Sequence, residues 1–314
     1  MRIFFPLLAA LAVCTTAVAG PNDVVRPHPP QKIQADTYVI HGPQGIPSVE
    51  NQGFMNNPAW IVTADGVVLI DPGSSVQAGR MVVAQLKKTT TKPVTHVFIT
   101  HVHGDHWLGN QAVLEAWPNA TLIAHPDMIK QAKEGADTFW LDLMSNLTKG
   151  YTDGTRAVIP TVEAADGQQF RIGGKTFRIH SSDDAHSKTD LMIELVEDKI
   201  LFTGDNVLNR QSMNLRDGTF KGVIKATQRA YDLNAKRYVP GHGKTSSKRT
   251  FIADQKAYFD ILLKEVRRMY DEGKSDFEMK PVIAEKLKAY KNWAEFEANL
   301  GLQISLAILE IEQE

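Results

Sequence analysis

The chain has 314 residues, of which 43% are hydrophobic and 23% charged, so it can bury a substantial core and is neither disordered nor fibrous. Lys and Arg number 35 against 36 Asp and Glu, a net charge of -1, and this balance supplies no overall positive field to attract nucleic acid or an anionic membrane. The length fits one large domain or two ordinary ones.

The first twenty residues have the order of an export signal. Arg2 is followed by an apolar run from Ile3 to Val13 and then by Ala17-Val18-Ala19, as in a secretory signal peptide that is cleaved after Ala19. An N-terminal membrane anchor is the alternative, but the run is shorter than the ~20 residues that a span needs. We therefore predict a signal peptide over 1–19, a periplasmic or secreted location, and no membrane association after cleavage.

The single cysteine of the chain, Cys14, lies inside this predicted signal. The mature protein would then hold no disulfide, no catalytic thiolate and no cysteine metal ligand. Its chemistry would have to use nitrogen and oxygen ligands or nucleophiles.

Strands and helices are expected to alternate over most of the chain. Residues 20–35 are rich in proline and polar groups and predict an extended linker. Hydrophobic periodicity and turn residues then predict strands at 37–41, 59–63, 67–71, 94–100, 121–124, 170–179 (a hairpin around Gly173-Gly174), 191–197, 200–203 and 237–239. Helical patterns occur at 76–88, in the segment that follows HVHGDHWLGN and ends at 115, at 126–147 and at 221–233.

From residue 246 onward the strand signals stop. Three helical patterns follow, at 250–270, 277–290 and 294–311. The sequence thus predicts a layered α/β catalytic domain over 36–245 and a helical C-terminal extension over 246–314. The apolar stripes of the extension need a partner surface, so three roles are open: packing on the domain, a homodimer contact, and extension of one wall of the cleft.

Histidines are concentrated in the segment His101-Val102-His103-Gly104-Asp105-His106. Alternate residues at an extended strand end point to the same side, so His101 and His103 can reach one metal ion. Gly104 would allow a sharp turn that carries Asp105 and His106 toward a second ion. The alternative is a set of structural histidines near a helix N-terminus that Asp105 caps.

Three further candidate ligands, His186, Asp205 and His242, each follow a predicted strand. Gly204 and Gly241 allow the tight turns that would lift Asp205 and His242 out of a sheet edge. These residues complete two candidate metal sites. The first is His101/His103/His186 and the second is Asp105/His106/His242. Asp205 would be the carboxylate that bridges them. Imidazole and carboxylate ligands suit Zn²⁺ first, and Fe or Mn second.

The combined motifs resemble the metallo-β-lactamase superfamily. The resemblance rests on HVHGDH after a strand, the later His186, Thr203-Gly204-Asp205, the turn Pro240-Gly241-His242-Gly243, and Asp71 in LIDPG, which is similar to a structural aspartate of that family. It covers residues 35 to 245 and implies a four-layer αββα sandwich with a dinuclear site at one edge between the two sheets.

Two positions distinguish branches of the family. His103 stands where the flavo-diiron reductases carry a glutamate, which favours zinc hydrolysis over redox iron. Asp205 occupies the position that resembles the bridging aspartate of the glyoxalase II, lactonase and phosphodiesterase branches. The resemblance therefore disfavours β-lactam hydrolysis as the native reaction, whereas the predicted export favours it.

These features predict an exported hydrolase with two Zn²⁺ ions per chain. A metal-bridging hydroxide, oriented by Asp105, would attack a small acyl substrate: a thioester, ester, lactone or β-lactam. A phosphodiesterase or sulfatase, favoured by Arg210, Arg216 and Lys221, and a periplasmic metal-binding accessory protein of a sulfur-oxidation or quinoprotein system are the alternatives. The candidate substrate contacts are Asn209, Arg210, Phe54 and Trp140.

Overall fold

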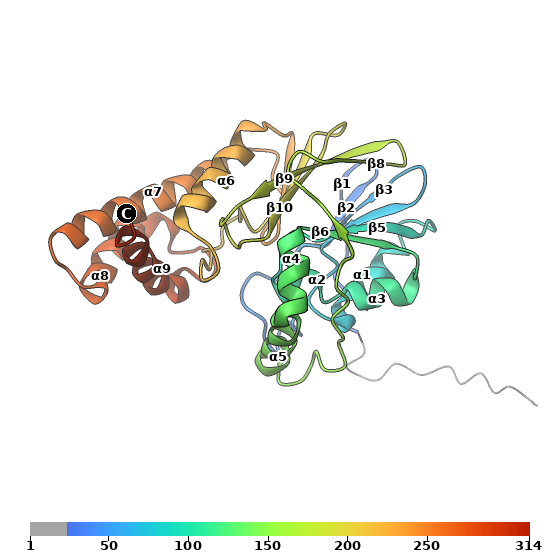
Figure 1. Cartoon of the computed structure of the whole chain (residues 1–314), viewed down its shortest axis with the longest axis horizontal. Coiled ribbons are helices and arrows are strands. Elements are labelled where there is room, and N and C mark those ends of the chain that lie inside the picture. The colour runs from blue at the N-terminus through green and yellow to red at the C-terminus, as the bar shows by residue number, and fades with distance from the viewer. Residues whose placement is uncertain (1–23) are drawn as a thin grey trace, which may run out of the picture.

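Two β-sheets face each other and helices cover their outer sides in the computed structural model, which describes residues 24–314 (Figure 1). The first sheet holds seven strands in chain order: β1 (Gln31–Gln34), β2 (Thr37–Val39), β3 (Ala59–Val62), β4 (Val67–Ile70), β5 (Val94–Phe98), β6 (Thr121–Ala124) and β7 (Val162–Glu163). The second holds five strands in the order β12 (Arg237–Pro240), β11 (Ile200–Gly204), β10 (Asp190–Leu195), β9 (Lys175–Ser182) and β8 (Gln169–Ile172).

Strand β4 shows how the sequence produces this layering. All four of its residues are apolar and buried, as expected for a strand that is covered on both faces. Because side chains alternate along a strand, Val67 and Leu69 pack under the first helical layer, while Val68 and Ile70 pack between the two sheets.

Helices form the two outer layers. Those before residue 150 are α1 (Val76–Leu86), α2 (Gly104–Trp107), α3 (Asn110–Ala116), α4 (Pro126–Gln131) and α5 (Asp137–Thr148), with a π-helical turn at Ala132–Ala136. On the other side, Met192 of β10 and Leu201 of β11 pack against Ala230 of α6 (Phe220–Asp232) and Phe251 of α7 (Thr250–Asp271). The predicted four-layer αββα sandwich is confirmed.

The C-terminal extension has a core of its own that continues into the domain. It consists of α7, α8 (Asp276–Lys286), a 3-10 turn (Lys288–Tyr290) and α9 (Phe296–Ile311). Its buried residues, such as Leu262 and Leu300, share one cluster with Leu208 and Met213 of the loop after β11. The extension therefore packs on the loop that leaves the second sheet.

The main differences from the predicted elements are two strands that were not predicted and one helix that is broken. Residues 31–34, expected within the linker, form β1, an edge strand in which Ile33 alone is buried, so the hydrophobic pattern was too weak to reveal it. The two-residue strand β7 lacks a signal for the same reason. The helix expected over 126–147 breaks at Gly135, whose φ of 118° is incompatible with a continuous helix.

The predicted signal peptide, 1–19, and its Cys14 lie outside the described residues. Within residues 24–314, no helix has both the length and the apolar character to cross a bilayer.

Candidate metal centre

Strand β5 and helix α2 position the first four candidate ligands. The chain leaves β5 in extended form, and His103 with φ of -65° and ψ of 133° occupies the N-cap of α2, so Asp105 and His106 lie on the first helical turn. Gly104 has a helical backbone conformation, so the predicted sharp turn at this residue is wrong. A Cβ at Gly104 would lie 2.8 Å from Cβ of Trp140, so its role is to admit that side chain.

The other three candidate ligands follow strands of the second sheet. His186 lies between β9 and β10, Asp205 follows β11, and His242 follows β12. Gly204 has the positive φ, 51°, that the predicted turn requires. Gly241 is needed for space, because a Cβ there would lie 2.0 Å from Oδ1 of Asp205.

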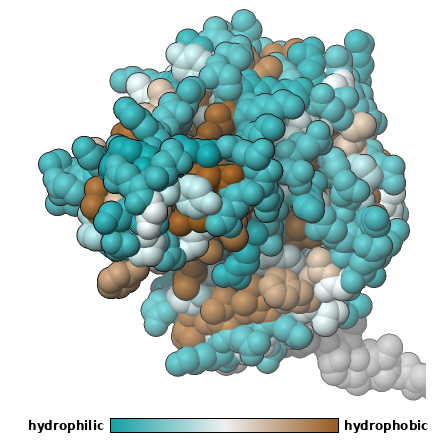
Figure 2. Space-filling model, turned by 60° about the vertical axis from the view of Figure 1, so that its left-hand side comes forward, coloured by the Kyte–Doolittle hydropathy of each residue, from teal (hydrophilic) through white to brown (hydrophobic). Residues whose placement is uncertain are grey.

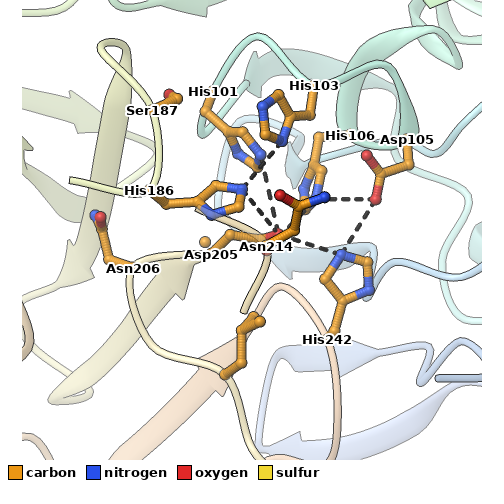
Figure 3. A network of polar contacts seen from close by, with 12 residues as sticks. His101, His103, Asp105, His106, His186, Ser187, Asp205, Asn206, Asn214 and His242 are labelled. Atoms are coloured by element: carbon orange, nitrogen blue, oxygen red, sulfur yellow. Dashed lines mark hydrogen bonds and ion pairs between the residues drawn. The ribbon is translucent and has the colours of Figure 1, made fainter. Parts of the chain in front are cut away.

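The structure brings all seven predicted ligands together at one edge between the sheets, with Asp205 in the middle (Figure 3). Oδ2 of Asp205 lies 3.5 Å from Nε2 of His186 and 3.3 Å from Nε2 of His242. Oδ1 of Asp205 lies 3.5 Å from Nε2 of His106. One carboxylate thus contacts histidines of both predicted sites, which is the position of a bridging ligand.

The ligand atoms form the two predicted groups. His101, His103 and His186 present atoms within 4.8 Å of one another, and Asp105, His106 and His242 do the same. Oδ2 of Asp105 lies 3.3 Å from His106 Nε2 and 3.1 Å from His242 Nε2. Such spacing places each set around a point that a single ion could occupy.

Hydrogen bonds orient three of the imidazoles so that one nitrogen of each is left for the centre. Nδ1 of His106 donates to Oδ2 of Asp71 (2.8 Å), and Nδ1 of His242 donates to the carbonyl of Met55 (3.0 Å). Nε2 of His103 pairs with Oδ2 of Asp217 at 3.0 Å, so its Nδ1 faces inward. This arrangement is typical of metal-binding histidines.

Asp71 anchors this orienting layer. It accepts hydrogen bonds from the backbone N–H (2.9 Å) and the hydroxyl (2.7 Å) of Thr100, while Oγ1 of Thr100 lies 3.0 Å from Nδ1 of His101. Asp71 has a φ of 50°, a conformation uncommon outside glycine. The structural role that the resemblance implied for Asp71 therefore corresponds to contacts behind two candidate ligands.

Three inward-facing atoms test whether a metal ion fits. His101 Nε2, His106 Nε2 and Asp205 Oδ1 are buried, and none has a hydrogen-bond partner within residues 24–314. A buried polar atom without a partner is costly, and cations bound at the two candidate sites would satisfy all three. Nitrogen and oxygen donors without sulfur fit Zn²⁺, and also Fe or Mn.

The charges of the centre are strongly coupled. Burial opposes the charged form of His106 and His242, but Asp105 and Asp205 raise the pKa of His106 well above its usual value and that of His242 to about 10. Burial and the neighbouring His103 lower the pKa of His186 to about 3. Despite burial, His242 and His106 hold the pKa of Asp205 well below its usual value, so the carboxylate is ionised and ready to bind a cation.

A cavity of about 370 Å³ opens beside the ligands. Its wall includes side chains of His103, Asp105, His186, Asp205 and His242. A second part of the wall is apolar and consists largely of α5: Phe139, Trp140, Leu143, Met144 and Leu147. Figure 2 shows apolar surface gathered low on the face that it presents, in the part of the molecule where α5 lies.

The predicted substrate contacts divide into two groups. Trp140 lines the cavity, and its ring centroid lies 4.7 Å from that of His103. Phe54 requires a correction, because it is 0% exposed and packs in the core under the first helical layer. Asn209 and Arg210 do not line this cavity; Asn209 donates to the carbonyl of Lys244 instead.

Several residues of the site escaped the sequence analysis. The loop after β11 supplies Gln211, Asn214 and Asp217, and the start of α9 supplies Glu295 and Asn299. Asn214 lies in front of the ligands in Figure 3. The polar character of the loop was visible in the sequence, but nothing there could relate residue 295 to the metal ligands.

Comparison with known proteins identifies the family. The model of the metallo-beta-lactamase superfamily matches residues 52–242, a range that contains all seven candidate ligands. The chain belongs to this superfamily of metallo-hydrolases, as its motifs predicted.

Individual relatives share limited sequence identity with the chain. An atrochrysone carboxyl ACP thioesterase of Emericella nidulans is 27% identical over 160 residues, which are 51% of this chain and 42% of that protein. The chain thus spans less than half the length of this relative.

Solved structures with similar folds cover more of the chain. A sec-alkyl sulfatase variant has a TM-score of 0.67 at 17% identity, covering 90% of this chain and 50% of its own. A metallo-beta-lactamase family protein of Thermus thermophilus has a TM-score of 0.62 at 18% identity, covering 90% of this chain and 95% of its own. At these identities the likeness concerns the fold.

Proposed function

We propose that the protein is an exported, zinc-dependent hydrolase of small acyl substrates: thioesters, esters, lactones or β-lactams. One observation carries the proposal, namely that two largely buried sets of nitrogen and oxygen donors both contact Asp205 and open into a cavity with an apolar wall. The name of the thioesterase relative supports an acyl substrate.

Two Zn²⁺ ions held by these seven residues would supply a hydroxide nucleophile at neutral pH and polarise the bond under attack. The residues of the chain keep the centre ready for this chemistry. Oδ2 of Asp105 faces His106 and His242, so its Oδ1 is available to accept a hydrogen bond from the attacking water and orient it.

Trp140 and its neighbours on α5 would hold the acyl part of the substrate. The ring of Trp140 packs beside His103, so an acyl chain that lies along α5 begins next to the candidate ligands. Burying such a chain stabilises the complex by about 25 cal/mol per Å² of apolar surface and excludes water from one side of the reacting bond.

A phosphodiesterase or sulfatase is the second candidate. Arg216 lines the cavity and could pair with an anionic group, and the fold is similar to that of a sec-alkyl sulfatase. The apolar wall fits the alkyl part of such a sulfate as well as it fits an acyl chain. The accessory-protein alternative requires metal binding without turnover.

Metal analysis and a substrate panel test these candidates together. The protein, expressed as residues 20–314, is assayed for zinc and for hydrolysis of nitrocefin, a thioester, a lactone, a phosphodiester and an alkyl sulfate, with and without a chelator. Two zinc ions per chain and a chelator-sensitive activity on an acyl substrate are expected. Activity confined to the sulfate or phosphodiester would replace the acyl proposal, and two zinc ions without turnover would favour the accessory protein.

Asp105→Asn is the matched variant for catalysis, and Asp232→Asn, on the exposed face of α6, is its control. We expect the first to lose at least about 100-fold in kcat/KM and the second to retain wild-type activity. Export is tested separately by following the full chain in a secreting bacterial host, where cleavage after Ala19 is expected.

A further inference from the structure

The start of helix α9 contributes a polar patch to the cavity that holds the metal ligands. Glu295 and Asn299 come from the C-terminal extension, and Gln211 comes from the loop after β11. We call these three residues the α9 subsite. Its two segments lie about 80 residues apart in sequence, and the proposed hydrolysis uses none of the three side chains.

Backbone contacts fix the two segments against each other. Ser212 N–H donates to the carbonyl of Ala294 (2.8 Å), and Ala294 N–H donates to the carbonyl of Arg210 (3.0 Å). The side-chain amide of Asn299 donates to the carbonyl of Ser212 at 2.9 Å. The α9 subsite is therefore pre-formed, which reduces the entropy that a ligand would lose on binding.

Gln211 is the observation that points to a ligand. Gln211 is 8% exposed and lines the cavity. Its Oε1 is buried without a hydrogen-bond partner among the described residues. A buried amide that lacks a partner carries a free-energy cost. Rotation of the terminal amide would turn Oε1 toward the cavity, where an entering N–H donor could bond to it and remove that cost.

Glu295 adds a negative charge at the same place. It lines the cavity, and no ion pair involves it within residues 24–314. Its φ of 59° is unusual for a residue other than glycine, and its Oε1 lies 3.5 Å from the point where a Cβ of Gly45 would stand. Gly45 thus leaves space in front of a carboxylate that the chain itself does not neutralise.

We propose that the α9 subsite binds a protonated amine or another cationic N–H donor on the substrate. This proposal rests on the proposed function for the position of the reacting bond, which lies at the metal ligands of the same cavity. A substrate would then have a hydrolysable group at one end, an apolar middle against α5, and an ammonium group that donates to Glu295 and to Gln211. The C-terminal extension would in this way select substrates and not only support the fold.

Binding measurements on the zinc-loaded protein test the subsite. The probes are alkyl hydroxamates of several chain lengths, whose hydroxamate group binds zinc and whose other end is an ammonium, a hydroxyl or a methyl group. At the best length we expect the ammonium probe to bind about tenfold more tightly than its methyl analogue, as for a charged hydrogen bond that is partly desolvated. Added salt should reduce this preference.

Glu295→Gln is the decisive variant, and Glu297→Gln, an exposed acid on the same helix, is the control. The preference for ammonium should disappear in the first and persist in the second. Equal affinity of wild type for the ammonium and methyl probes at every length would overturn the proposal, and so would a preference that Glu295→Gln retains. A hydroxyl probe that binds better than the ammonium would also overturn it, because the subsite would then recognise a neutral group.

These outcomes are independent of turnover. An ammonium preference in a protein that hydrolyses none of the panel would support the subsite and contradict the proposed hydrolysis. Hydrolysis of acyl substrates without any such preference would support the proposed hydrolysis and contradict the subsite.

Discussion

The imidazoles of the centre owe their orientation to residues that would not touch a metal ion. Asp71 contacts Nδ1 of His106 directly and is linked to His101 through Thr100. One carboxylate therefore controls the tautomer and direction of a histidine in each candidate site. The importance of such residues is best measured through the metal affinity itself.

Replacing Asp71 by Asn should weaken zinc binding. The carboxylate accepts from the Thr100 N–H at Oδ1 and from both the Thr100 hydroxyl and His106 at Oδ2. An amide has one acceptor oxygen and no negative charge, so it cannot keep all three hydrogen bonds. We expect zinc affinity to fall about 10- to 100-fold, as measured by competition with a chromophoric chelator. Asp65→Asn, in the exposed turn between β3 and β4, should bind zinc like wild type; equal affinities for the two variants would contradict the role of Asp71.

The metal-free centre should bind zinc more tightly as the pH rises. Neighbouring carboxylates raise the pKa of His106 and bring that of His242 to about 10. Both side chains are therefore in the cationic imidazolium form at neutral pH. Zinc binds the neutral imidazole, so it must displace these protons. Raising the pH removes them beforehand and lowers this cost.

Calorimetry in buffers of different ionisation enthalpy measures the released protons directly. We expect proton release on zinc binding and an affinity that increases from about pH 6 to about pH 9. His96→Gln is a suitable control, because burial lowers the pKa of His96 and its side chain lies outside the centre. An affinity that stays constant over this range would show that the carboxylates do not raise the pKa values of His106 and His242.

At the level of elements, the ends of strands determine where the ligands meet. β11 and β12 are parallel neighbours, so Asp205 and His242 emerge side by side from the same edge of the second sheet. The close approach of the two loops depends on Gly241, which leaves room for the Asp205 carboxylate.

A methyl group at Gly241 should disrupt the centre more than the fold. The Cβ of Gly241→Ala would lie 2.0 Å from Oδ1 of Asp205 and 3.0 Å from Cε1 of His106, so the carboxylate must move. We expect the zinc content to fall below one ion per chain and the free energy of unfolding to fall by about 1–3 kcal/mol, measured by metal analysis and urea unfolding.

Gly301→Ala provides the matched control for this variant. Gly301 lies inside α9, and the nearest atom to its added Cβ would be Nζ of Lys280 at 3.7 Å. Alanine there should stabilise the helix by about 0.5–1 kcal/mol and leave the zinc content unchanged. Zinc loss in both variants would indicate a general effect of alanine substitution.

Across the whole molecule, the C-terminal extension and the αββα sandwich share buried surface. Leu300 of α9 is 0% exposed and lies in the cluster that includes Leu208 and Met213 from the loop after β11. That loop begins next to Asp205. The two parts should therefore unfold together, with the extension supporting one wall of the cavity.

Truncation of Leu300 tests this coupling. Leu300→Ala should lower the free energy of unfolding by about 2–5 kcal/mol, as expected for a cavity in a packed core, in a single transition by circular dichroism and tryptophan fluorescence. Leu309→Ala on the same helix, where the side chain is 52% exposed, should change it by less than about 0.5 kcal/mol. Two separate transitions for the Leu300 variant would show that the extension folds independently.

The layers and the candidate ligands could be predicted from the amino-acid sequence, because both depend on local order. Apolar strands such as 67–70 indicate burial on both faces, and the motif from His101 to His106 places four donors within six residues. The turns before Asp205 and His242 are also local signals, since Gly204 and Gly241 directly precede these two residues in the sequence.

The surroundings of these ligands depend on tertiary packing, because the contacts there join residues that are distant in the chain. The burial of Phe54, the pairing of Asp217 with His103, and the presence of Glu295 in the cavity all depend on how loops and the extension pack. Such packing follows from the fit of many side chains at once, and no spacing within one segment encodes it.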